Sequence, residues 1–289
     1  MPSDKKDSRQ RRMQGVVACP HCHAGLLWEE GIAACQTCSE SYPVVHGIPH
    51  FVNPHIVATS DAVFQSQVMH GSSLTARLYT AGKRIVSSEY MPHDHVREFL
   101  SNVRENELVV ELGSGNRRLS EAVINIDLYP FPHVDVVADI MHAPLKDGVV
   151  DAVVLDTVLE HVPEPQRVVD EIYRILKPEG RVLCLAPFVF PYHGYPKHYF
   201  NFSKDGLEHL FRRFSRREVR TNMGPTSALV NLASEYVGIA FSSDNKLLYS
   251  IGKGLALLPI FVLKYLDRLW VRSSRAANLA GVLSLWAVK

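Results

Sequence analysis

Charge of one sign does not predominate in this chain, and long apolar runs are scarce. Its 31 Lys and Arg residues nearly balance its 30 Asp and Glu residues, so no overall field would draw it to nucleic acid or to an acidic membrane. We expect no membrane-spanning segment, because no apolar stretch reaches about 20 unbroken residues. We also expect no secretory signal, because the first apolar stretch, MQGVVAC, runs directly into cysteines. A cytoplasmic, reducing compartment is therefore expected.

The length of 289 residues suits one large domain with appendages or two modest domains. The chain begins with a locally basic stretch, KKDSRQRR, and shows no internal repeat. We predict that residues 1–16 form a disordered, solvated leader.

Four of the five cysteines form two CxxC pairs within CPHCHAGLLWEEGIAACQTC. This spacing is typical of a zinc site, since each CxxC turn points two thiolates at one ion. Four thiolates leave no open coordination position, so we predict a structural zinc ion rather than a catalytic one. A reducing compartment disfavours the alternative of disulfides. The predicted metal ligands are Cys19, Cys22, Cys35 and Cys38.

The segment after these cysteines, SYPVVHGIPHFV, has strand residues broken by proline and glycine, so we expect the zinc-binding unit to cover residues 17–53. The CPxC pair, the second CxxC pair and the YP…GIP tail resemble the small zinc ribbons that accompany methyltransferases of the tRNA and rRNA modification machinery.

Residues 54–93 show few periodic signals and are predicted to form a linker with cover helices. From residue 94 onward, apolar stretches alternate with turns or helices: ELVVE, AVINID, DVVAD, DAVVLD and RVLCLAP. The clearest helix is PEPQRVVDEIYRILKPEG, whose apolar residues fall on one stripe. This alternation predicts an α/β domain over residues 94–289, with a doubly wound, mostly parallel sheet.

The stretch VVELGSG places Gly113 and Gly115 at the end of a predicted strand, and Asp127 follows Gly113 by only fourteen positions. A dinucleotide-binding fingerprint has a third glycine and an acidic residue about 20 positions onward. A nicotinamide-dependent oxidoreductase is therefore disfavoured. The usual helix after the glycine loop has to shrink to about one turn, RLSEA.

Together, VVELGSG, NID, VVADI and the run from PLKDG to LCLAP resemble class I S-adenosylmethionine-dependent methyltransferases of type 11, with a Rossmann-like fold. The resemblance implies that S-adenosylmethionine lies over the carboxyl ends of the strands, where ligands of open parallel sheets bind. Asp127 would accept the ribose hydroxyls, and Asp139 would accept from the adenine amino group. A solvated strand-end acid and a helix-capping aspartate are the alternatives for these two residues.

The resemblance also implies that Glu111 meets the methionine ammonium group. Either Arg117 or Arg118 is a candidate clamp for the cofactor carboxylate, because a guanidinium binds a carboxylate bidentately; exposure to solvent is the alternative. The remaining residues predicted to contact the cofactor are Gly113, Ser114, Gly115, Ile140, Asp156 and Thr157.

The loop PFVFPYHGYPKHYFNF follows the fifth predicted strand and is dense in His and Tyr. We consider His193, His198 and Tyr199 candidates that orient the acceptor or take its proton. A lid without catalytic groups is the alternative.

Apolar segments with interrupting lysines and a proline follow, and we expect them to form helices at about residues 225–273, inserted before a last strand. A helical cap over the substrate pocket and a membrane-surface or lipid-binding role are both open. Either would suit an apolar acceptor and a chain that is cytoplasmic or associated with a membrane.

These observations predict a methyltransferase that acts on a small-molecule, glycan or lipid-like acceptor by in-line displacement. Methylation of an rRNA or tRNA base is one alternative, although no broad basic surface is evident. A non-catalytic partner protein that keeps the fold is the other.

Overall fold

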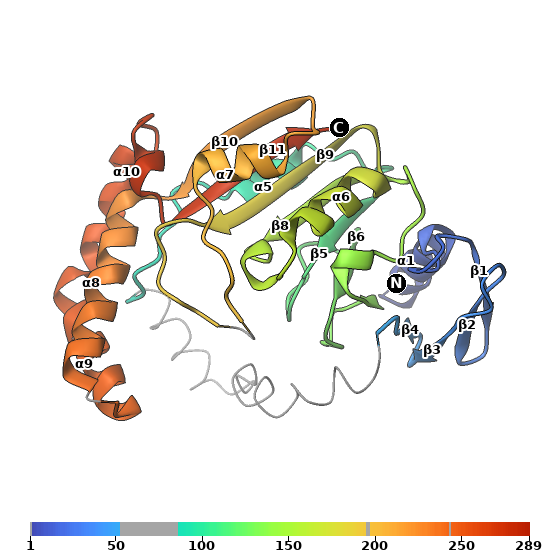
Figure 1. Cartoon of the computed structure of the whole chain (residues 1–289), viewed down its shortest axis with the longest axis horizontal. Helices are drawn as coiled ribbons and strands as arrows, with labels where there is room; N and C mark the ends of the chain where they lie inside the picture. The colour runs from blue at the N-terminus through green and yellow to red at the C-terminus, as the bar shows by residue number, and fades with distance from the viewer. Residues whose placement is uncertain (1, 53–85, 195–196, 243) are drawn as a thin grey trace.

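The computed structural model describes residues 2–52, 86–194, 197–242 and 244–289 (Figure 1). Most of the predicted linker with cover helices lies outside the described residues, and residues 86–93 contain neither helix nor strand. The described chain contains a seven-stranded sheet and a four-stranded sheet. These are the α/β domain and the N-terminal unit that the sequence predicts.

The larger sheet has the strand order β10-β11-β9-β8-β5-β6-β7. Strands β5 to β9 pair in parallel, and β11 is antiparallel to both of its neighbours. The predicted mostly parallel sheet is therefore confirmed. The strands are β5 (Val109–Leu112), β6 (Val123–Asp127), β7 (Val136–Val137), β8 (Val150–Asp156), β9 (Leu176–Pro187), β10 (Arg216–Met223) and β11 (Val282–Val288).

Helices cover both faces of this sheet (Figure 1). One face packs against α6 (Pro165–Ile175), which buries the apolar stripe predicted for it, and against α7 (Lys204–Leu210), which buries Leu207 and Leu210. The other face packs against α5 (His95–Ser101), whose Phe99 joins a second core with Trp286 of β11. The side chains of Asp94 and Ser203 cap α5 and α7 by accepting from backbone N–H groups.

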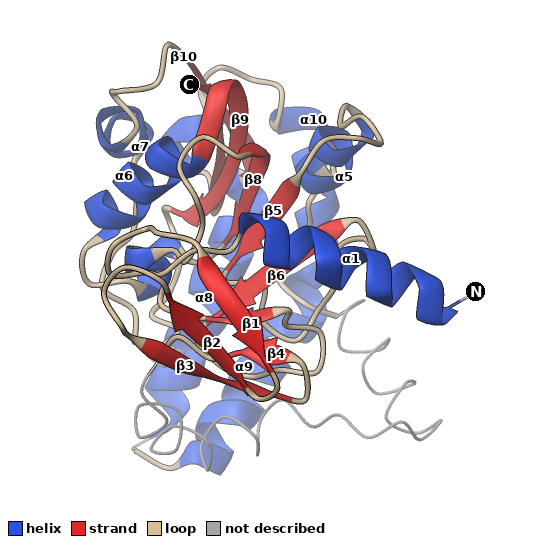
Figure 2. Ribbon diagram, turned by 90° about the vertical axis from the view of Figure 1, so that its right-hand side faces the viewer, coloured by secondary structure: helices blue, strands red, loops and turns tan. Residues whose placement is uncertain are grey.

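The predicted disordered leader is wrong, because residues 2–16 form helix α1 (Pro2–Val16). Met13 is buried in the same core as the larger sheet, and Nε of Arg9 lies 3.1 Å from Oδ1 of Asp135. Figure 2 shows α1 beside the small sheet. A polar helix can thus be fixed by a few apolar side chains, such as Met13 and Val16, and by ion pairs of one arginine, which composition alone does not reveal.

The small sheet contains β1 (Leu26–Glu29), β2 (Ile32–Cys35), β3 (Ser41–Val45) and β4 (Ile48–Pro49), paired in that order and antiparallel. It adjoins the larger sheet at β7, where the backbone N–H of Phe51 donates to the carbonyl of Val137 over 2.8 Å. Backbone pairing across this edge covers strand β7, which would otherwise expose unpaired groups.

The expected helical insertion lies between β10 and β11. It contains α8 (Pro225–Ser242), α9 (Lys246–Ile260), the 3₁₀ helix η3 (Phe261–Leu266), α10 (Asp267–Trp270) and the 3₁₀ helix η4 (Ala276–Leu279). Short 3₁₀ helices η1 (Ile140–His142) and η2 (Leu159–His161) complete the fold. In Figure 1, α8 and α9 lie at the end of the molecule opposite the small sheet.

One stretch of the insertion bears on the expectation of no membrane-spanning segment, which stays a prediction. The 25-residue stretch Lys246–Trp270 contains a window of 18 residues with a mean hydropathy of 1.6, so by length and composition alone it could cross a membrane. Pro259 lies within α9 and Lys264 within η3 without ending the helical stretch.

Candidate functional site

The candidate site lies where the order of the parallel strands reverses. From β5 the chain adds β6 and β7 on one side, then β8 and β9 on the other. Ligands of open α/β sheets bind at the carboxyl ends of the strands at such a switch point. Glu111 is near the end of β5 and Asp156 ends β8, while Asp127 ends the neighbouring strand β6. The fold therefore brings these three predicted residues to one edge.

The two positions after β5 that carry glycine require it for different structural reasons. Both have positive φ, +72° at Gly113 and +58° at Gly115, where a side chain causes strain. A Cβ on Gly113 would lie 2.6 Å from Cγ1 of Val158, whereas a Cβ on Gly115 would meet no atom within 4 Å. Gly113 is required for packing between loops, and Gly115 leaves open space at the site. Thr157, after β8, also has a left-handed φ of +57°, a strain that often marks functional sites.

Asp127 and Asp139 both have structural roles in the loops. Oδ2 of Asp127 accepts from the N–H of Gly115 over 2.8 Å, and Oδ1 accepts from the N–H of Tyr129 over 2.9 Å. Burial raises the pKa of Asp127 against the lowering effect of these hydrogen bonds. Asp139 caps η1 by accepting from the N–H of Met141 over 2.9 Å. Each carboxylate oxygen has a second lone pair, so contact with ribose or adenine stays a prediction; Ile140, the first residue of η1, is buried beside Asp139.

Arg117 joins two acids of the site. Its Nη2 lies 3.0 Å from Oε1 of Glu111 and 2.7 Å from Oδ2 of Asp156. Glu111 is 1% exposed, and its Oε2 has no hydrogen-bond partner among the described residues. Burial raises the pKa of Glu111 to about 7, although the Arg117 guanidinium opposes this effect. The buried hydroxyl of Ser114 also has no partner in the described part of the chain. The site thus has a cation over its acids and two buried polar atoms that find no partner within the described ranges.

Arg118 does not face this site. Its guanidinium donates to Oδ1 of Asp135 over 2.9 Å and to the carbonyl of Val123 over 3.0 Å, so only Arg117 keeps the predicted position of a carboxylate clamp. The one-turn helix predicted at RLSEA is wrong, because residues 118–122 contain one bend and one turn but no helix. The side chain of Asn125 holds this segment by donating to the carbonyl of Arg117 over 2.8 Å.

A cavity of 1260 Å³ opens beside the acids. Arg117 and Asp156 line one part of it, and Lys264 and Tyr265 of η3 line another. The cavity therefore connects the predicted cofactor edge with the base of the helical insertion. A second cavity of 540 Å³, lined by Arg181 and other residues, lies by the opposite end of the sheet and away from these acids.

The loop after β9 brings His193 close to Glu160 and His161 of η2, which sequence reasoning did not select as site residues. Nε2 of His193 lies 3.7 Å from Oε1 of Glu160, and Nε2 of His161 lies 3.9 Å from the same oxygen. His198 accepts from the N–H of His193 at Nδ1 and contacts the carbonyl of Phe200 at Nε2. Both ring nitrogens of His198 are therefore engaged in the loop, while Tyr199 is 44% exposed on the surface. Catalytic roles for His193, His198 and Tyr199 stay predictions.

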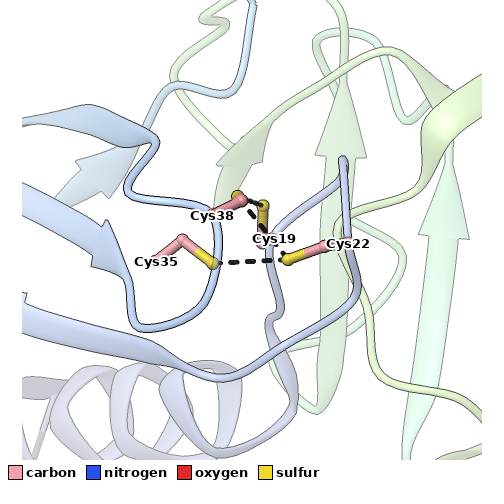
Figure 3. Close-up of side chains that lie close together, drawn as sticks. All are labelled: Cys19, Cys22, Cys35 and Cys38. Carbon is pink, nitrogen blue, oxygen red and sulfur yellow. Dashed lines mark hydrogen bonds between the residues drawn. The ribbon is translucent and has the colours of Figure 1, made fainter.

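The four predicted metal ligands converge in the small sheet (Figure 3). Their sulfur atoms lie 3.4 to 3.6 Å apart: 3.6 Å for Cys19 and Cys38, 3.4 Å for Cys22 and Cys35, and 3.6 Å for Cys22 and Cys38. Disulfide sulfurs lie about 2 Å apart, and tetrahedral zinc at about 2.3 Å from each thiolate separates them by about 3.8 Å. The cluster is therefore close to the geometry of a four-thiolate metal site.

Comparison with known proteins gives one family match, a methyltransferase domain model that covers residues 99–184. A demethylmenaquinone methyltransferase of Lactiplantibacillus plantarum is 42% identical over 45 residues, which are 16% of this chain and 19% of that protein. A 37.1 kDa protein of a Streptomyces fradiae transposon is 27% identical over 131 residues, 45% of this chain and 37% of that protein. The matches thus span well under half the length of either relative.

Among solved structures, phosphoethanolamine N-methyltransferase 2 of Haemonchus contortus in complex with S-adenosylmethionine is similar with a TM-score of 0.43 and 16% identity. The similarity covers 68% of this chain and 51% of that one. The matched domain, residues 99–184, extends from α5 into β9 and contains Glu111, Asp127 and Asp156. The chain thus carries a match to a methyltransferase domain over the strands and loops that form the candidate site.

Proposed function

We propose that this chain is an S-adenosylmethionine-dependent methyltransferase. The observation that carries the proposal is the acidic edge at the switch point, within the segment that matches a methyltransferase domain. The glycine loop, the open space at Gly115 and the partnerless Oε2 of Glu111 fit a ligand that carries an ammonium group and ribose hydroxyls. S-adenosylmethionine would supply an electrophilic methyl group on its sulfonium.

The residues of the site would bind and orient this ligand. Glu111, when ionised, would accept from the ammonium group, and the second lone pairs of Asp127 would accept from the ribose hydroxyls. Arg117 would then exchange its contact with Asp156 for the ligand carboxylate, because one guanidinium can bind either group bidentately. Asp156 would be left beside the 1260 Å³ cavity, where the acceptor would bind. Alignment of acceptor and methyl group would provide most of the rate enhancement.

The four-cysteine cluster is proposed to be a structural zinc ribbon. Its sulfur separations suit tetrahedral zinc, and Cys19 and Cys35 are buried. The small sheet contributes only a few side chains to the main core, and small units of this size commonly depend on a metal for stability.

We further propose that the acceptor is a lipid-like molecule and that α8 and α9 seat the protein in a membrane. In α8 the buried residues are mostly polar or small, among them Asn231, Ser234 and Gly238, whereas Ile239 and Phe241 are 61% and 66% exposed. A helix of a water-soluble protein shows the reverse arrangement. Small residues between helices and apolar residues outside are typical of helices in lipid.

The contact between α8 and α9 is also typical of helices in lipid. A Cβ on Gly252 of α9 would lie 3.5 Å from Cα of Gly238, so the backbones approach closely at these glycines. Between the helices, the carboxylate of Glu235 contacts Tyr249 and Lys253. Charged groups within lipid are commonly paired in this way. The hairpin therefore pairs the charges of Glu235 and Lys253 with each other and presents apolar side chains outward.

The hairpin is fixed to the site at its base. Oδ1 and Oδ2 of the buried Asp267 accept from the N–H groups of Thr226 and Ser227 over 2.8 and 2.9 Å, which joins α10 to the start of α8. The exposed Trp270 and Arg272 lie just beyond α9 and η3, and such residues favour the interface between lipid and water. A molecule in the membrane would then meet the cavity at Tyr265.

Transfer of label from S-adenosylmethionine carrying a radioactive methyl group tests the function. Purified protein is incubated with lipid, small-molecule and RNA fractions, and the fraction that becomes labelled identifies the acceptor class. We expect label in lipid with the wild type and none with Asp127→Ala. Label in RNA would contradict the lipid acceptor but keep the activity, whereas binding of S-adenosylmethionine without transfer to any fraction would favour a non-catalytic partner protein.

Flotation with phospholipid vesicles tests the membrane contact separately. The wild type should float with vesicles, and the double variant Ile239→Asp, Leu255→Asp should remain in solution, because both side chains are exposed and their replacement leaves the core unchanged. Leu27→Asp on β1, at 51% exposure, is the matched control and should float. A wild type that stays in solution would mean that another part of the chain or a protein partner covers these helices.

A further inference from the structure

Glu160 is a buried acid whose carboxylate lacks hydrogen bonds. It follows β8 in η2, is 0% exposed, and neither Oε1 nor Oε2 has a hydrogen-bond partner among the described residues. Burial of an ionised carboxylate without hydrogen bonds is costly, so such a group usually faces a cation. Two histidine rings, those of His161 and His193, lie within 4 Å of it.

The hydrogen bonds of these rings determine which nitrogen faces Glu160. Nδ1 of His161 lies 2.6 Å from the carbonyl of Lys197, and Nδ1 of His193 lies 3.1 Å from the carbonyl of Pro191. A carbonyl only accepts, so each Nδ1 carries a proton. In a neutral ring this leaves a lone pair on Nε2, and both Nε2 atoms face Oε1 of Glu160. Contact between a carbonyl and Nδ1 commonly orients a histidine that binds a metal.

We propose that Glu160, His161 and His193 bind a divalent transition-metal ion, at a site separate from the four cysteines. Their ligand atoms lie within 4.8 Å of one another. With bonds of about 2.1 Å, neighbouring ligands of a tetrahedral ion lie about 3.4 Å apart, so the separations of 3.7 and 3.9 Å need to shorten by only a few tenths of an ångström.

The donor set indicates the kind of ion. Two imidazoles and one carboxylate suit zinc, iron and related first-row ions rather than calcium or magnesium. Three protein ligands leave at least one coordination position for water or for an oxygen of the acceptor. His198 does not complete the set, because its Nδ1 accepts from the N–H of His193. Metal binding here does not depend on the proposed methyl transfer.

Equilibrium dialysis against micromolar Zn²⁺, followed by elemental analysis, tests the site in the full chain. The readout is the difference between variants, whatever the cysteines bind. We expect the wild type to retain one zinc equivalent more than Glu160→Gln or His193→Ala. His142→Gln, which removes an exposed histidine on η1, should retain as much zinc as the wild type. Circular dichroism verifies that each variant is folded.

Equal zinc contents in the wild type, Glu160→Gln and His193→Ala would overturn the proposal. Two separate variants guard against misfolding of one, since Glu160 is buried and His193 lies in a partly exposed loop. The competing structure is an ion pair between Glu160 and a protonated His193. This ion pair would give equal zinc contents in all three proteins. It would also make the histidine titration curve of Glu160→Gln, measured by NMR, differ from that of the wild type.

Discussion

Replacement of Gly113 by alanine should separate the packing role of the glycine loop from its proposed binding role. The new Cβ would lie 2.6 and 2.7 Å from the two γ-methyl groups of Val158, well inside the contact distance of about 3.5 Å between carbon atoms. Overpacking of this kind costs about 1–3 kcal/mol. The positive φ adds about 1–2 kcal/mol for any residue other than glycine.

Alanine also lowers the conformational entropy of the unfolded chain, and this offsets about 0.4–1 kcal/mol of the lost stability. The net loss in the free energy of unfolding for Gly113→Ala is therefore about 1–4.5 kcal/mol. Gly115→Ala has similar φ strain but meets no atom within 4 Å, so its loss should stay below about 1.5 kcal/mol. Conversely, Gly115→Ala should weaken S-adenosylmethionine binding, because its methyl group enters the open space of the site.

Urea unfolding followed by circular dichroism measures the two stabilities. A second check is the double variant Gly113→Ala, Val158→Ala, whose destabilisation should be smaller than the sum of the two single changes, because the smaller side chain removes the overlap. Equal destabilisation by Gly113→Ala and Gly115→Ala, or strict additivity in the double variant, would refute the packing argument.

Three further predictions concern pH, metal and salt. Burial raises the pKa of Glu111 to about 7 in the folded protein, whereas in the unfolded chain it is about 4.5. Between these two pH values the folded protein binds one proton more than the unfolded chain. The contribution of Glu111 to stability therefore falls as pH rises from about 4.5 to 7. S-adenosylmethionine affinity should rise over pH 6 to 8 as Glu111 ionises, and Glu111→Gln should flatten this rise in calorimetric titrations. Cys19→Ser should lose one zinc equivalent and unfold the small sheet while cofactor binding persists, as elemental analysis and calorimetry would show; unchanged zinc would contradict the ribbon. Binding to lipid vesicles should change little between 50 and 200 mM salt, whereas binding to RNA would weaken steeply, and a steep loss of activity with salt would favour the RNA alternative.

Much of the main domain follows from local pattern. The strands from β5 to β9 are buried apolar runs between turn residues, and α6 shows its core face in the spacing of Val168, Ile172 and Ile175. Asp94 is recognisable as a cap because its position before an apolar helix is a local signal. The four-cysteine cluster is recognisable for the same reason, since the two cysteines of each CxxC pair lie close together in the sequence.

Features that depend on contacts between residues far apart in the sequence could not be predicted from the sequence. The docking of α1 depends on Arg9 reaching Asp135, more than 100 positions away. The Glu160 cluster needs His193 from the loop after another strand. Composition shows that α8 is apolar, but only the structure shows that Ser234 and Gly238 face inward while Ile239 faces outward. The prediction of a single-turn helix at RLSEA is wrong because Asp135 and Asn125, which lie further along the chain, hold the start of this segment in an irregular loop.

Calorimetric titration of the purified chain with S-adenosylmethionine tests the central claim most directly. The account predicts one binding site per chain, with affinity reduced at least about 30-fold in Asp127→Ala, because the carboxylate both accepts from the ligand and holds the N–H groups of Gly115 and Tyr129. Asp127→Asn should lie between that variant and the wild type. Absence of binding by the folded wild type, or equal binding by Asp127→Ala, would contradict the account.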